Sequence, residues 1–200
     1  MPPKAKYTRE EIVEVALKLA ADKGLGALTA RELGAALGTS SRPIFTAFKN
    51  MGDVLAEVRK AAFVHFGDYI RSGGDGSPAF KQVGIRMISF AQEQPKLYRL
   101  LFMTEKPEAR TFEDVFNNLG ELAPVCIDTI KFVYDLDEKD AMFLFKQVWI
   151  FTYGIGSLIA TGMCSFEDDE IQSMLTNEFQ AMLMLIKSGK AGKDAAENKS

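Results

Sequence analysis

The chain has 200 residues, of which 47% are hydrophobic and 26% charged, a composition typical of a globular protein with a buried core and not of a disordered or collagen-like chain. Its two cysteines, Cys126 and Cys164, are too few and too far apart for a disulfide framework or a zinc knuckle, which favours a reducing cytoplasm. The net charge is −3, yet residues 1–60 carry ten Lys or Arg against seven Asp or Glu, so this part is predicted to contact a polyanion.

The first two predicted helices begin at capping-box patterns. Thr8 and Glu11 have the spacing at which a hydroxyl and a carboxylate each accept a bond from a free amide of the first turn. We expect a helix from there to Gly24, a residue that favours the left-handed conformation of a helix end. Thr29 and Glu32 repeat the spacing, which predicts a short second helix that ends at the next glycine.

A third helix is predicted after a turn at Gly38. Ser40 or Ser41 can cap it, Pro43 lies in its first turn, where the missing N–H costs nothing, and we expect it to run to about Lys49.

The rest of the chain keeps helical periodicity, and helices are expected near residues 52–72, 79–93, 95–105, 110–134, 137–164 and 168–187. Pro124 should kink or split the helix over 110–134. Residues 148–166 are 19 residues without a charge, but seven are Gly, Ser or Thr and basic flanks are poor, so we expect a buried helix and no membrane span. No apolar secretory segment opens the sequence, and residues 189–200 are expected to form a disordered tail.

The second and third helices have the arrangement of a helix-turn-helix, whose second helix enters the DNA major groove. One face of the third helix is apolar and is expected to pack on the first two: Ile44, Phe45 and Phe48. The opposite face places three DNA-reading side chains at i, i+4 and i+7: Arg42, Thr46 and Lys49. Arginine can donate two hydrogen bonds to guanine, threonine can contact a thymine methyl group, and lysine can form an ion pair with phosphate. A solvated face on an ordinary helical bundle is the alternative interpretation.

Three segments within residues 7–55 read YTREEI, LTARELGAALGTSS and FTAFKN. They resemble the DNA-binding head of TetR-type (tetracycline-repressor-like) bacterial regulators. Trp149, with Gly154 and Leu158, is similar to a Trp-x-x-x-His-Gly pattern of some members, with Tyr153 in place of the histidine. The resemblance implies an all-α protein with a DNA-binding domain over 1–50 and a ligand-binding and dimerisation body over 51–188. It further implies a homodimer through the last two long helices and a ligand that changes the affinity for a palindromic operator.

The resemblance also implies roles for individual residues of the head. Base contacts are expected from Arg31, Ser41, Arg42 and Thr46. Phosphate contacts are expected from Thr29, Thr39 and Lys49, with Lys4, Lys6 and Arg9 as supplements. The family usually has Tyr where Phe45 stands and Lys where Met51 stands, and both give phosphate contacts. These departures leave open an alternative, a helical small-molecule-binding or interaction protein that has lost operator binding.

The body is rich in aromatic side chains, which favours an apolar ligand pocket. The expected lining is Phe66, Tyr69, Phe90, Tyr98, Phe102, Met103, Phe116, Trp149 and Tyr153, although each of them is individually more typical of core. His65 is the only histidine; it can orient a ligand or sense pH, but a satisfied boundary histidine is the commoner role. Cys126 and Cys164 are expected to be buried packing residues, with redox sensing as the alternative.

No metal-ligand spacing and no set of nucleophile, base and orienting group can be assembled around one histidine. We therefore expect no cofactor, no metal and no catalysis. The sequence predicts a ligand-responsive transcriptional regulator, a repressor in preference to an activator. Its expected partners are operator DNA, a second copy of the chain and an apolar or aromatic ligand.

Overall fold

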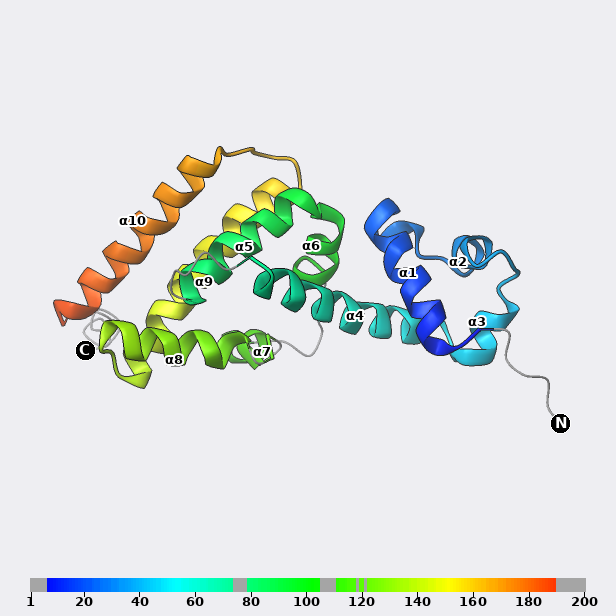
Figure 1. Ribbon diagram of the computed structural model, residues 1–200, viewed down its shortest axis with the longest axis horizontal. Coiled ribbons are helices and arrows are strands. Elements are labelled where there is room, and N and C mark those ends of the chain that lie inside the picture. The colour runs from blue at the N-terminus through cyan, green and yellow to red at the C-terminus, as the bar shows by residue number, and fades with distance from the viewer. Residues whose placement is uncertain (1–6, 74–78, 105–110, 118, 121, 190–200) are drawn as a thin grey trace, which may run out of the picture. The chain divides into compact units, whose positions relative to one another are not determined.

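The computed structural model describes residues 7–73, 79–104, 111–117, 119–120 and 122–189. All regular elements in these ranges are helices, which confirms the all-α prediction (Figure 1). In chain order they are α1 (Arg9–Lys23), the 3-10 turn η1 (Leu25–Ala27), α2 (Ala30–Ala36), α3 (Arg42–Ala47), α4 (Met51–Arg71), α5 (Ala79–Glu93), α6 (Pro95–Phe102), α7 (Phe112–Asn117), α8 (Leu122–Tyr134), α9 (Glu138–Ala160) and α10 (Asp168–Lys187). Residues 190–200, most of the expected tail, lie outside the described ranges, as do Lys4 and Lys6.

The helix starts predicted from capping residues are confirmed. The Thr8 hydroxyl accepts a bond from the Glu11 amide at 3.1 Å, and the Glu11 carboxylate accepts one from the Thr8 amide at 2.8 Å. α1 ends at Gly24, whose φ is 84°, so the chain leaves the helix through a conformation that glycine adopts readily. At α2 the Thr29 hydroxyl accepts a bond from the Glu32 amide at 3.2 Å, but the second bond of the capping box is not formed, because the Thr29 amide donates to the Ala27 carbonyl at 2.9 Å. These local bonds fix where the head helices begin.

Two later boundaries differ from the prediction. The helix expected over 110–134 is divided into α7 and α8, but the break is not at Pro124, which lies in the first turn of α8. The chain turns at Gly120 instead, whose φ of 58° interrupts helical geometry. α9 ends at Ala160 and not near residue 164, because Gly162 follows with a φ of 73°. Proline in a first turn loses no hydrogen bond, whereas a left-handed glycine ends a helix.

The chain forms two compact units. The first comprises residues 1–69 and 90–104, and the second comprises residues 70–89 and 105–200. The first unit is thus larger than the DNA-binding domain expected over 1–50, because α6 and much of α4 belong to it. The assignment of DNA binding to residues 1–50 and of ligand binding and dimerisation to 51–188 concerns function and stays a prediction.

Aromatic packing fills the core of the first unit. The Phe66 ring, which is fully buried, meets the rings of Phe90 and Phe102 edge-on, at centroid distances of 5.1 and 5.2 Å. Tyr98 is also fully buried and lies 4.9 Å from the Phe102 ring. α1 packs on α6 and α2, and α2 packs on α3. The core therefore joins the helix-turn-helix to α4 and α6.

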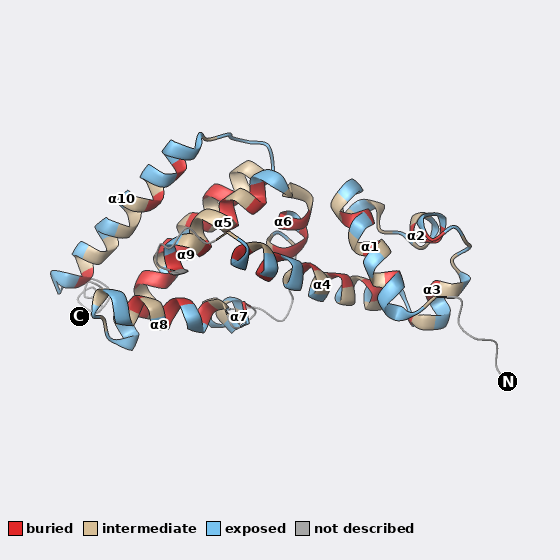
Figure 2. Ribbon diagram, viewed as in Figure 1, coloured by how far each residue is buried: buried red, intermediate tan, exposed pale blue. Residues whose placement is uncertain are grey.

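α9 is the central helix of the second unit, and buried residues recur along it (Figure 2). α8 and α10 both pack against it, and one buried cluster joins Ile88, Ile155, Ile171 and Leu175. Within the described chain, α9 is the one helix that length and composition alone would allow to cross a membrane. Its packing against α8 and α10 accounts for that composition, so length and composition are no evidence of a span.

Candidate nucleic-acid interface

The turn between α2 and α3 requires a glycine at position 34. The Thr39 amide donates to the Gly34 carbonyl at 2.9 Å, which folds the turn back onto α2. A Cβ on Gly34 would lie 3.0 Å from the carbonyl carbon of Ser40 and 3.1 Å from the amide nitrogen of Ser41. Both are backbone atoms, which cannot swing aside as a side chain can. The close approach at Gly34 therefore fixes how α3 is presented.

α3 is anchored by two side chains of its apolar face and not by three. Ile44 and Phe48 are buried, whereas Phe45 is 47% exposed. Residues i and i+4 share one face of a helix, but the next residue is rotated by about 100°. The expectation that Phe45 packs on the first two helices is therefore wrong. An exposed aromatic ring stands beside the polar face of α3 instead.

Arg9 holds the end of α3 in place. Its guanidinium donates to the Ala47 carbonyl at 2.7 Å and lies 4.2 Å from the centroid of the Phe48 ring. Tyr7 makes a second tie, because its hydroxyl donates to the Leu37 carbonyl at 2.6 Å. Arg9 was expected to supplement the phosphate contacts, but these bonds give its guanidinium a structural role.

Arg42 and Thr46 lie exposed on α3, as predicted, and Lys49 is exposed as well. The Thr46 hydroxyl donates to the Arg42 carbonyl at 3.0 Å, which leaves its oxygen and methyl group on the surface. The Arg42 guanidinium and the Lys49 ammonium have no hydrogen bond or ion pair within the described residues. α3 ends at Ala47, so Lys49 lies just beyond it and not in its last turn.

The other residues expected to contact DNA lie on α2 and in the turn. Arg31 and Thr29 are exposed at the start of α2, and Thr39 and Ser41 are half-buried in the turn. Ser41 is the N-cap residue of α3, but the Ser40 hydroxyl is the one that accepts a bond, from the Arg42 amide at 3.4 Å. The fold thus brings the predicted positions between 29 and 49 onto one helix-turn-helix. The role of each as a DNA contact stays a prediction.

Acidic groups near this surface already have partners. The Glu32 carboxylate lies 3.6 Å from the Lys23 ammonium, and the Asp53 carboxylate accepts a bond from the Lys49 amide at 3.2 Å. Within the described residues, no acidic side chain pairs with the charged groups of Arg31, Arg42 or Lys49. Their positive charge therefore favours the binding of a polyanion. Met51 is the first residue of α4 and is half-buried.

Three further candidate residues have ordinary structural roles. His65 is exposed, and its Nε2 atom lies 2.8 Å from the Gln94 side-chain oxygen, as a satisfied boundary histidine would. Burial raises the pKa of the Cys126 thiol to about 12, which agrees with a packing role. Cys164 is exposed, so the expectation that both cysteines are buried is wrong for it. It lies in the loop between α9 and α10, where no helix covers it.

The nine side chains expected to line a ligand pocket are divided between the two units, and their joint role in binding a ligand stays a prediction. Six belong to the first unit: Phe66, Tyr69, Phe90, Tyr98, Phe102 and Met103. Five of these six pack on one another as core, and Met103 is exposed. The remaining three belong to the second unit: Phe116, Trp149 and Tyr153. Trp149 lines a void of only about 10 Å³.

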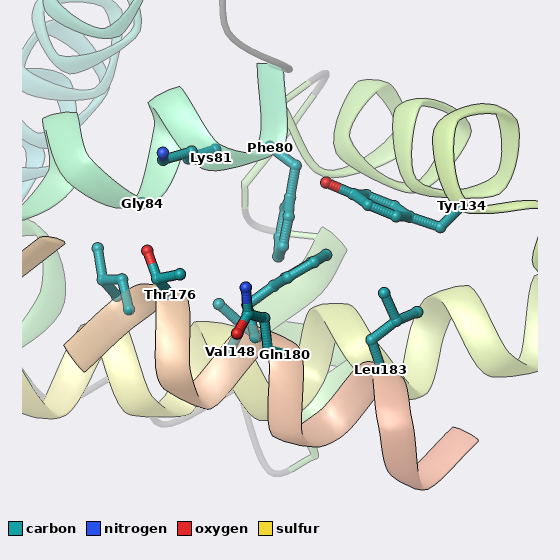
Figure 3. A pocket seen from close by; sticks show the side chains of 10 residues that line it. Phe80, Lys81, Gly84, Tyr134, Val148, Thr176, Gln180 and Leu183 are labelled. Atoms are coloured by element: carbon teal, nitrogen blue, oxygen red, sulfur yellow. The ribbon is translucent and has the colours of Figure 1, made fainter. Parts of the chain in front are cut away.

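A larger cavity, of about 320 Å³, lies in the second unit between α5, α8, α9 and α10 (Figure 3). Its lining is Phe80, Lys81, Gly84, Tyr134, Val148, Leu175, Thr176, Phe179, Gln180 and Leu183. It shares Phe80, Gly84 and Val148 with the void beside Trp149. The expected lining differs from this one because aromatic density indicates a core and not the place where that core is incomplete. Gly84 leaves space on α5 beside α9 and α10, but a single glycine in a helix does not by itself indicate a cavity.

One protein family matches part of the sequence. Residues 12–58 match the family described as "Bacterial regulatory proteins, tetR family", which confirms the resemblance seen in the head. No curated protein matches the chain significantly.

Solved structures with the same fold span nearly the whole chain. A TetR-family transcriptional regulator from Mesorhizobium loti is 17% identical over 88% of this chain and 95% of its own, with a TM-score of 0.61. A TetR variant from Acinetobacter baumannii in complex with minocycline is 15% identical over 94% and 100%, with a TM-score of 0.61. SmeT, the repressor of the Stenotrophomonas maltophilia multidrug efflux pump SmeDEF, is 16% identical over 90% of each chain, with a TM-score of 0.53.

Proposed function

We propose that this chain is a homodimeric repressor in the cytoplasm, without enzymatic activity. It binds a palindromic operator and responds to a small ligand. The head sequence and the fold, which are those of TetR-type transcriptional regulators, support this proposal. The observation that carries the proposal is that Arg42 and Thr46 are exposed on α3, with Lys49 exposed just beyond its end, while Ile44 and Phe48 anchor the segment from behind. This division into an anchored and an exposed face is what a recognition helix needs in the major groove.

The contacts divide into those that read bases and those that fix position. We assign base contacts to Arg31, Ser41, Arg42 and Thr46. We assign phosphate contacts to Thr29, Thr39 and Lys49. The exposed Phe45 ring cannot donate to phosphate, so we assign it an apolar contact with a sugar or a thymine methyl.

Two copies would read two half-sites, because a two-fold dimer requires an operator of the same symmetry. We place the dimer contact on α9 and α10, whose exposed apolar side chains include Ile150 and Met184. Repression is then steric, since a dimer on the operator excludes polymerase. The structure of a TetR variant in complex with minocycline supports the binding of a ligand, and SmeT, the repressor of an efflux pump, supports the role of a repressor.

Selection from a pool of random duplexes tests the proposal. The full chain should enrich an inverted repeat whose half-sites are separated by about 34 Å, roughly one helical turn. Affinity should fall steeply with salt, because phosphate contacts release counterions. Enrichment of no sequence, or of a single asymmetric half-site, would contradict the proposal.

The second candidate is a helical binding protein whose head no longer reads DNA. Two observations favour it: Phe45 and Met51 stand where the family has phosphate-contacting Tyr and Lys. This candidate predicts that selection enriches nothing while the second unit still binds a small ligand. The same selection therefore separates the two functions.

A further inference from the structure

The cavity between α5, α8, α9 and α10 has a polarised lining. Most of its walls are apolar, contributed by Phe80, Val148, Leu175, Phe179 and Leu183. The polar groups that line it are the Tyr134 hydroxyl, the Thr176 hydroxyl, the Gln180 amide and the Lys81 ammonium. Such a site would hold a molecule with a large apolar part and a small polar part.

Lys81 is the one charged residue among those that line the cavity. Its ammonium has no ion pair or hydrogen bond with any residue that the structure describes. It also lies in the first turn of α5, where the helix dipole disfavours a cation. Lys81 is exposed, so its ammonium lies where the cavity meets solvent, and an anionic group of an occupant placed there would compensate both the ammonium and the positive end of the helix.

The arrangement of the side chains agrees with this. Figure 3 shows the Lys81 ammonium and the Thr176 hydroxyl on the same side of the cavity, with the Phe80 ring farther along it. A carboxylate can accept a charge-assisted bond from the ammonium and a second bond from the hydroxyl. An apolar body attached to that carboxylate would extend toward Phe80, Phe179 and Leu183.

A buried hydroxyl beside the cavity is also left without a partner. Thr152 is 2% exposed, and its hydroxyl makes no hydrogen bond with any residue that the structure describes. It lines the small void next to Gly84, and a Cβ on Gly84 would lie 3.7 Å from it. Leaving a buried hydroxyl unpaired costs stability, and the void of about 10 Å³ beside the cavity has room for one small polar group, such as a water, that would pair with it.

We propose that the cavity of the second unit binds a small aromatic or branched aliphatic carboxylate, with the anionic group at Lys81 and Thr176. The volume of about 320 Å³ suits one or two fused rings and not a large polycyclic compound. This inference rests on the proposed function, because it names the class of ligand for a regulator of this kind. It does not require that ligand binding releases DNA.

The test compares three probes that share one bicyclic body: 2-naphthoate, its neutral amide and 2-naphthylmethylammonium. Calorimetry with the full chain should show that 2-naphthoate binds about tenfold or more tightly than the amide, since one charge-assisted contact is worth roughly that factor, and that the cation binds worst. Equal affinity for the three probes, preference for the cation or no binding at all would overturn the proposal.

Lys81→Met keeps the apolar stem and removes the charge. It should reduce the affinity for 2-naphthoate about tenfold and leave the affinity for the amide unchanged. Lys139→Met is the matched control, because Lys139 is exposed on α9 and does not line the cavity. Equal effects of the two variants on 2-naphthoate binding would overturn the proposal.

The result is separable from the proposed regulatory function. DNA affinity is measured in parallel by fluorescence anisotropy, with and without 2-naphthoate. If the probe binds through Lys81 and DNA affinity does not change, the ligand class stands and ligand-responsive regulation fails. If the chain binds an operator but shows no preference for the anionic probe, the ligand class fails and DNA binding stands.

Discussion

Gly34 is the residue on which the presentation of α3 depends most. Alanine in a helix interior is ordinarily more stable than glycine by about 1 kcal/mol. Here the added Cβ would lie 3.0 Å from the backbone of the turn, so the turn must move away from α2. We expect Gly34→Ala to lower the free energy of unfolding by about 1–2 kcal/mol, as overpacking does. Urea denaturation measures the change.

Gly26→Ala is the control for this substitution, because a Cβ on Gly26 would meet nothing within 4 Å. It should leave the free energy of unfolding within about 0.5 kcal/mol of the parent, as isolated surface changes do. An unchanged or raised stability of Gly34→Ala would mean that the turn does not press on α2.

Met51 occupies a position where the family usually has a phosphate-contacting lysine. Met51→Lys should add one such contact and steepen the slope of log K against log salt by about 0.9, on specific and random duplexes alike. Asn117→Lys, on exposed α7, adds the same charge elsewhere and is the control. If both variants change the salt slope equally, residue 51 does not face the DNA backbone.

Helix boundaries are predicted best from the sequence where local hydrogen bonds determine them. The capping residues Thr8 and Thr29 fixed the starts of α1 and α2 because each hydroxyl bonds an amide three residues on. Phe45 was misplaced because in a helix as short as α3 one residue decides which side chains point inward. The α7–α8 break was assigned to Pro124, although a proline in a first turn is compatible with a helix and Gly120 is not.

The cavity could not be predicted from the sequence, because it depends on packing between helices far apart in the chain. Aromatic residues such as Phe66 and Phe90 lie against one another and fill space. The cavity instead lies where α5 meets α10, beside Gly84 and Phe179. Aromatic density indicates a large core, but only the spatial arrangement of helices shows where that core is incomplete.

Gly84 offers a test of that space within α5. A Cβ there would make ordinary contacts with Thr152 at 3.7 Å and Leu175 at 3.9 Å. Gly84→Ala should therefore raise the free energy of unfolding by about 0.5–1 kcal/mol, through helix propensity and added packing. Urea denaturation at one protein concentration measures the change, and a loss of stability would show that the space is absent.

The proposed function requires a dimer through α9 and α10. Ile150 on α9 is 50% exposed, which suits a contact that only a second copy covers. We expect Ile150→Glu to convert the dimer to a monomer at micromolar concentration, because a buried unpaired carboxylate is costly. Light scattering gives the molecular mass.

Phe132→Glu is the matched control, since Phe132 on α8 is 90% exposed and lies outside the proposed interface. This variant should remain a dimer. If Phe132→Glu dissociates the protein and Ile150→Glu does not, the two copies meet through α8 and the proposed interface is wrong.

The most direct test of the account compares Arg42→Ala with Lys49→Ala by anisotropy, on the selected duplex and on a scrambled duplex of the same length. We predict that Arg42→Ala costs about 1–3 kcal/mol on the selected duplex and much less on the scrambled one, because arginine reads a base edge. Lys49→Ala should weaken both alike, because lysine contacts phosphate. Equal losses of Arg42→Ala on both duplexes would contradict the claim that α3 reads the operator.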